Sequence, residues 1–115
     1  MATVCELLGK TIIDITQNGN DELIFKTEDG LAYKMHHYQD CCETVEIADI
    51  VGNLADLINS PILMAEEVSQ VDENAPESGT WTFYKFATIK GYVTIRWYGS
   101  SNGHYSESVN FDLIS

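Results

Sequence analysis

Hydrophobic and polar residues alternate along much of the chain, and this period of two is typical of β-strands with one buried face. The alternation is clearest in three segments near the carboxyl end, residues 80–89, 92–98 and 105–113. A turn at Lys90-Gly91 joins the first two segments and predicts one shared apolar face. That face carries Tyr84, Phe86, Thr88, Val93, Ile95 and Trp97, and we expect the third strand to extend it with Val109, Phe111 and Leu113.

The amino-terminal part predicts a second group of strands, at residues 11–17, 22–27 and 31–38. Residues 18–21 form a polar turn signal between the first two. The second turn has two interpretations. A two-residue Asp29-Gly30 turn pairs apolar with polar side chains, whereas a three-residue loop with a left-handed Gly30 pairs Phe25 with Tyr33 and Leu23 with Met35. The second interpretation keeps apolar residues together, so we adopt it.

The middle of the chain predicts a strand at residues 43–48, a short helix near Asn53–Asn59 and a strand at residues 62–71. The helix follows from the spacing of Leu54, Leu57 and Ile58, and Ser60-Pro61 ends it. A longer helix that begins at Val45 also fits one apolar face, although Gly52 weakens it.

These elements predict an α+β fold, a twisted and mainly antiparallel β-sheet of about seven strands with one short helix. A length of 115 residues suits a single domain that spans residues 1–115. Val71–Gly79 is the most polar segment, and we expect a surface loop there.

The composition is strongly acidic, with a net charge of -12. The segment from Asp40 to Glu77 contains ten carboxylates and no Lys or Arg, whereas Lys85, Lys90 and Arg96 follow it. Such a charge disfavours direct binding of nucleic acid, because the protein repels phosphates over most of its surface. The remaining partners are a basic protein for the acidic middle or a small anion near the carboxyl end. The alternative to a binding role is that the acidity serves only to keep the protein soluble.

No segment has the twenty or so apolar residues that cross a bilayer, and the amino terminus lacks a secretion signal. The three cysteines are therefore expected to remain reduced, and we expect a cytoplasmic protein, inside a host cell if the chain is viral. The sequence predicts neither a cofactor nor a membrane partner.

The outward face of the predicted carboxyl-terminal sheet is the candidate ligand site. Arginine suits bidentate contacts with phosphate, tyrosines can stack on a base, and a glycine-flanked loop exposes N–H groups to an anion. Trp81 and Trp97 are expected in the core instead. The ligand-binding residues that we predict are Lys85, Tyr92, Arg96, Tyr98, Ser100, Ser101, Asn102, His104 and Ser106. The alternative is an ordinary hairpin loop beside a solvated sheet face.

Three stretches carry a resemblance to known proteins: HHYQDCCE at residues 36–43, WTFYKFATIKG at 81–91 and TIRWYGSSNG at 94–103. They resemble a family of small acidic proteins encoded largely by bacteriophages and prophages. The resemblance implies no catalytic residues. It implies an accessory role against host defence, because small phage proteins of this kind often sequester nucleotide immune signals or block nucleic-acid-guided nucleases.

The densest cluster of potential metal ligands is His36, His37, Asp40, Cys41, Cys42 and Glu43. Zinc sites favour cysteines two to four residues apart, and adjacent residues on a strand point to opposite faces, so we predict no metal site. A catalytic thiol is also disfavoured, because neighbouring carboxylates raise a thiol pKa. No carboxylate pair stands out by its spacing. We therefore predict that the protein is not an enzyme.

The leading hypothesis is a non-enzymatic phage anti-defence protein, a sponge for a small anionic nucleotide of host immunity. The alternative is an acidic inhibitor that mimics nucleic acid and blocks a basic site on a defence nuclease, as anti-CRISPR proteins do. In either case the aromatic, half-polar sheet face also suits contacts between copies of the chain in a homo-oligomer.

Overall fold

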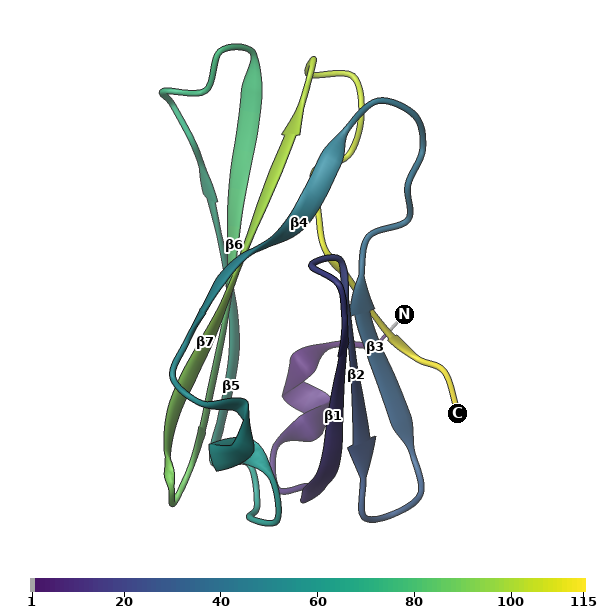
Figure 1. Cartoon of the computed structure of the whole chain (residues 1–115), viewed down its shortest axis with the longest axis vertical. Coiled ribbons are helices and arrows are strands. Elements are labelled where there is room, and N and C mark those ends of the chain that lie inside the picture. The colour runs from purple at the N-terminus through teal and green to yellow at the C-terminus, as the bar shows by residue number, and fades with distance from the viewer. Residues whose placement is uncertain (1) are drawn as a thin grey trace.

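Two four-stranded antiparallel β-sheets face each other and hold the core between them (Figure 1). The computed structural model describes residues 2–115. One sheet has the order β1-β2-β3-β8 and the other β4-β7-β6-β5. The strands are β1 (Ile12–Asn18), β2 (Glu22–Thr27), β3 (Ala32–His36), β4 (Thr44–Val51), β5 (Met64–Val71), β6 (Ser78–Thr88), β7 (Gly91–Ser101) and β8 (Asn110–Leu113).

The core forms because alternate residues of both sheets are apolar and point inward. Phe25 of the first sheet meets Phe86 of the second, with ring centroids 6.0 Å apart. The fully buried Trp97 donates its indole N–H to the sulfur of Met35 across the two sheets, at 3.2 Å. The predicted core face of β6 and β7 is therefore confirmed. The predicted turn is wrong by one residue, because the turn is Ile89-Lys90 and not Lys90-Gly91. Tyr84 therefore pairs with Ile95 and Phe86 with Val93, a shift of two residues that keeps the same face inward.

The amino-terminal hairpin also follows the sequence prediction. Phe25 pairs with Tyr33 and Leu23 with Met35, and Gly30 has a φ of 87° in the connecting loop. A glycine suits this position because side chains rarely adopt a positive φ. The preference for the three-residue loop is confirmed.

The predicted helix is wrong. Among residues 2–115 the helical elements are two short 3₁₀ turns, η1 (Val4–Leu7) and η2 (Leu54–Leu57), so the fold is β with eight strands instead of α+β with seven. Extended pairing stops η2 after one turn, because Asn59 N–H donates to the carbonyl of Ile12. The longer helix from Val45 is also excluded, since that segment is β4 and pairs with β7.

The third strand of the predicted carboxyl-terminal sheet is in the other sheet. Strand β7 lies between β6 and β4, while β8 pairs with β3. Residues 102–109 cross from one sheet to the other, and Phe111 packs on Tyr33 with ring centroids 5.3 Å apart. Sequence periodicity shows which face of a strand is buried but does not identify its neighbour.

Neither of the helical turns in residues 2–115 has the length or apolar character that a membrane-crossing helix requires.

The close contact between Gly99 of β7 and the segment of residues 102–109 leads to a prediction for the variant Gly99→Ala. A Cβ atom at this position would lie 2.6 Å from the carbonyl oxygen of Glu107, so the backbone of the segment would have to shift. We expect a loss of about 1–3 kcal/mol in the free energy of unfolding, measured by urea denaturation. Ser100→Ala, on the opposite face of β7, is the matched control. Equal stability of both variants and the wild type would contradict this packing.

Candidate functional site

The outer face of the β4-β7-β6-β5 sheet contains two adjoining hollows of about 340 and 620 Å³. Both are lined by Asp72 and Trp81, so they form one continuous depression, here called the acidic groove. The β5–β6 loop extends beyond the end of this sheet (Figure 1), and its residues Asp72, Glu73 and Asn74 line the groove. The groove is lined by Thr44, Glu46, Ala48, Gln70, Val71, Asp72, Glu73, Asn74, Trp81, Phe83, Arg96, Tyr98 and Ser100.

Aromatic rings form the floor of the groove because the inward packing of their strand neighbours turns them outward. Trp81 stacks on Phe83 with an interplanar angle of 4° and a centroid distance of 5.9 Å. Tyr98 meets the Trp81 ring edge-on at 4.7 Å. Trp81 is therefore a groove residue and not the core residue that the sequence predicts, whereas Trp97 is buried as expected.

Arg96 lies on this face, half exposed, but it already has an anionic partner. Its Nε and Nη2 atoms donate to the two carboxylate oxygens of Asp49, each at 2.5 Å. The guanidinium carbon also lies 5.7 Å from the Trp81 ring centroid, within cation–π range. The Arg96 guanidinium holds the pKa of Asp49 below its usual value. An incoming phosphate would have to displace this bidentate carboxylate.

The wall of the groove is formed by the start of the β5–β6 loop. The Tyr98 hydroxyl donates to Asp72 Oδ2 at 2.7 Å, and this bond raises the pKa of the phenol. Asp72 Oδ1 accepts the N–H of Asn74, which shapes the turn. Three carboxylates therefore surround the aromatic floor, those of Glu46, Asp72 and Glu73. Arg96 is the one cation among the lining residues, and Asp49 neutralises its charge. The groove is net negative.

The nine predicted ligand residues separate into three groups. Arg96, Tyr98 and Ser100 line the acidic groove. Lys85 and Tyr92 are exposed on the same sheet face, where Lys85 lies opposite Glu66 and Tyr92 lies about 13 Å along the strand from Arg96.

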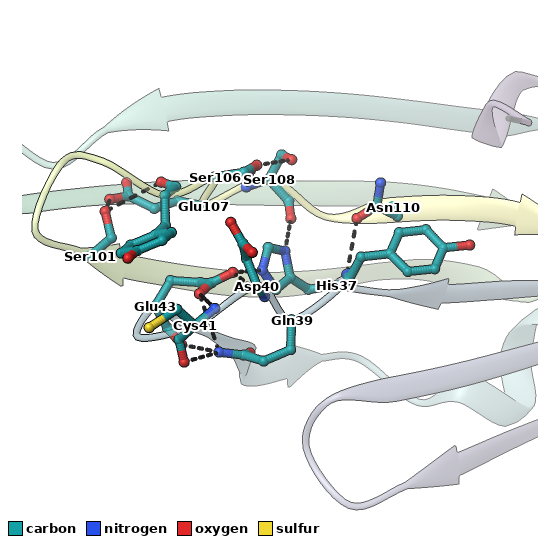
Figure 2. A network of polar contacts seen from close by, with 12 residues as sticks. His37, Gln39, Asp40, Cys41, Glu43, Ser101, Ser106, Glu107, Ser108 and Asn110 are labelled. Atoms are coloured by element: carbon teal, nitrogen blue, oxygen red, sulfur yellow. Dashed lines mark hydrogen bonds and ion pairs between the residues drawn. The ribbon is translucent and has the colours of Figure 1, made fainter.

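The remaining four predicted ligand residues do not line the groove either; they are Ser101, Asn102, His104 and Ser106. They leave it because β7 ends at Ser101 and the chain crosses to β8. The Ser101 hydroxyl donates to Glu107 Oε2 at 2.5 Å, and the Asn102 side-chain oxygen accepts the N–H of His104. The Ser106 hydroxyl lies 2.7 Å from that of Ser108. These contacts lie within the loop itself, and Figure 2 shows those of Ser101 and Ser106.

The acidic-inhibitor hypothesis singles out Asp72 and Glu73, together with Glu66 and Glu67, but sequence reasoning missed that acidic residues lie beside Arg96. Asp49 reaches Arg96 only because β4 pairs with β7 and contains a bulge between Ile47 and Asp49. Asp72 and Glu73 belong to the segment predicted as a loop, but their position over Trp81 depends on the pairing of β5 with β6. The charge run from Asp40 to Glu77 was the available signal.

A second polar cluster is centred on the carboxylate of Glu43 (Figure 2). It stabilises the segment between β3 and β4, where the chain passes from one sheet to the other. This buried group accepts the N–H groups of Asp40 and Cys41, each at 2.9 Å, and meets His37 Nε2 at 2.8 Å. The His37 Nδ1 atom lies 2.7 Å from the carbonyl oxygen of Ser108. Both ring nitrogens of His37 therefore lie at hydrogen-bonding distance from oxygen atoms.

The residues considered as metal ligands take part in these structural contacts instead. His36 pairs with Asp112 at 2.8 Å, whereas His37 pairs with Glu43. The structure joins Cys41 and Cys42 by a disulfide, contrary to the expectation of free thiols, and the two residues lie in a bend and not on a strand. Cys5 is free and exposed. Residues 2–115 contain no cluster of three or more potential metal-binding side chains.

The Glu43 cluster predicts a specific acid sensitivity. The hydrogen bond with His37, followed by those with the backbone, lowers the pKa of Glu43 to about 2. Because the folded-state pKa lies below the unfolded value, the stabilisation is complete above pH 4.5 or so and is lost as the pH falls towards 2. We expect Glu43→Gln to be less stable than the wild type at neutral pH, with a difference that narrows towards pH 2, measured by thermal denaturation. Glu28→Gln, an exposed control, should show a small and pH-independent difference. A constant difference for Glu43→Gln would contradict the proposed pairing.

Comparison with known proteins gives one match. A family model described as "Domain of unknown function (DUF7448)" matches residues 5–111. No curated protein and no solved structure matches the chain significantly.

Proposed function

The chain belongs to the DUF7448 family, a family of domains of unknown function, and we propose that it is a non-enzymatic binding protein whose acidic groove holds a basic segment of a partner protein. The observation that carries the proposal is the bidentate pairing of Arg96 with Asp49, which leaves Glu46, Asp72 and Glu73 as the unneutralised charges around the aromatic floor.

Aromatic rings surrounded by carboxylates favour cationic groups. A Lys or Arg side chain gains cation–π attraction over Trp81 and charge-assisted hydrogen bonds from carboxylates at the rim. The net charge of -12 adds long-range attraction for a basic surface. The same negative charge repels a phosphate group.

The resemblance to phage and prophage proteins supports a biological setting for this binding. In that setting the partner is a host defence nuclease, and its basic segment belongs to the cleft that otherwise receives nucleic acid. The protein then acts in the cytoplasm of the host cell, as an acidic inhibitor that mimics nucleic acid and does no chemistry on its partner.

Nucleotide sequestration is the second candidate. The location of Arg96 beside Trp81 and Tyr98 supports it, because a guanidinium and aromatic rings are the groups that hold a phosphate and a base. It requires Arg96 to exchange Asp49 for a phosphate, next to carboxylates that repel the ligand. The basic partner requires no such exchange.

A charge reversal in the groove tests the proposal. We expect the wild type to bind an arginine-rich peptide more weakly as the salt concentration rises, and not to bind an aspartate-rich peptide, in isothermal titration. Glu73→Lys should weaken binding by about threefold or more, because it places a like charge in the groove. Glu28→Lys, with the same change in net charge on the other sheet, is the matched control.

Two results would contradict the proposal. One is equal weakening by Glu73→Lys and Glu28→Lys, which would indicate attraction by net charge alone. The other is heat with cyclic or ADP-ribose-derived nucleotides and none with the basic peptide, which would favour nucleotide sequestration.

A further inference from the structure

The four edge strands of the two sheets differ in how they are protected against pairing with another chain. Exposed edges present free N–H and C=O groups, and proteins usually block them with bulges, short strands or covering segments. Strand β1 has a bulge between Ile12 and Asp14. Strand β4 has a bulge too, and the carbonyl of Asn20 accepts the N–H of Ile47 on it. Strand β8 has four residues, and Ala2 N–H donates to Phe111 on it.

Strand β5 lacks these forms of protection over most of its length. It pairs with β6 through eight residues in one register without a bulge. Every residue from Glu66 to Val71 is exposed, and none is Lys or Pro. The described residues cover its edge only near Ala65, whose carbonyl oxygen lies 3.7 Å from the sulfur of Cys5 in η1.

The hydrogen-bond pattern shows which groups face outward. Asp72 N–H donates to the carbonyl of Gly79, in the same register as the rest of the pair. In an antiparallel ladder the bonds alternate, so the N–H and C=O groups of Ala65, Glu67, Ser69 and Val71 point away from β6. From Glu67 to Val71 they form an open hydrogen-bonding edge.

The side chains along this edge select a basic partner. Glu66 and Glu67 lie on opposite faces of the strand and precede the exposed apolar residues Val68 and Val71, and Asp72 and Glu73 follow directly. Opposite charges on facing strands stabilise a pair, and like charges destabilise it. A second copy of this chain would bring two acidic strands together and would join two chains of net charge -12.

We propose that β5 accepts an extended basic segment of the partner as an additional β-strand, with Lys or Arg beside Glu66 and Glu67 and β-branched residues beside Val68 and Val71. This proposal rests on the proposed function, since it states how the same partner binds. The edge ends at Val71, a residue that lines the acidic groove, so a segment paired with β5 passes directly alongside the groove. Strand addition supplies backbone hydrogen bonds, and the alternate side chains supply selectivity.

Ser69→Pro tests the edge without breaking the sheet. The Ser69 N–H points outward, so a proline there removes a donor from the edge and leaves the β5–β6 ladder intact. The probe is a short peptide of alternating lysine and valine, compared with the same peptide carrying N-methyl groups on alternate residues, and binding is measured by fluorescence polarisation. We expect Ser69→Pro and the N-methylated peptide each to weaken binding about tenfold. Ser69→Thr, which keeps the N–H, should bind as the wild type does.

The other outcomes are distinguishable. Equal binding of both peptides by Ser69→Pro and the wild type, with weakening by Glu73→Lys, would overturn strand addition and leave the proposed function intact. No binding of either peptide by the wild type would overturn both. A wild type that forms dimers, with a monomeric Ser69→Pro variant, would assign the edge to a second copy and overturn the basic partner. If Ser69→Pro unfolds, the comparison of the two peptides with the wild-type protein decides.

Discussion

The burial of alternate residues of β6 and β7 between the two sheets is the constraint on which the rest of the structure depends. Trp97, Ile95 and Val93 pack inward, so the residues between them must point outward, since strand side chains alternate. Arg96 and Tyr98 therefore reach the outer surface together with Trp81, which pairs with Tyr98. The packing of the core therefore determines which side chains line the acidic groove on the outer face.

The local pattern of the sequence was sufficient for this part of the fold. It predicted the buried face of β6 and β7, the three-residue loop that ends in Gly30, and the outward direction of Arg96, but it placed the β6–β7 turn one residue too late. It was insufficient wherever the result depends on contacts between distant segments. The placement of β8 beside β3, the termination of η2 by Ile12 and the meeting of Asp49 with Arg96 all depend on partners that periodicity does not specify.

These distant contacts change the expected chemistry of the surface. An arginine among tyrosines, considered alone, is an anion site. The same arginine joined to Asp49 and bordered by Glu46, Asp72 and Glu73 belongs to a surface of the opposite sign. The Glu43 cluster contributes indirectly, because it fixes the crossing that leads into β4, the strand that carries both Glu46 and Asp49. A buried carboxylate thus supports the position of the carboxylates of Glu46 and Asp49.

The central claim is that the acidic groove attracts cations through its aromatic floor. The indole N–H signals of Trp81 and Trp97 in a ¹⁵N–¹H NMR spectrum test it directly, because Trp81 lines the groove and Trp97 is fully buried. The account predicts that an arginine-rich peptide shifts the Trp81 signal progressively while the Trp97 signal stays in place, and that ATP shifts neither. A Trp81 signal that moves with ATP and ignores the peptide would contradict it.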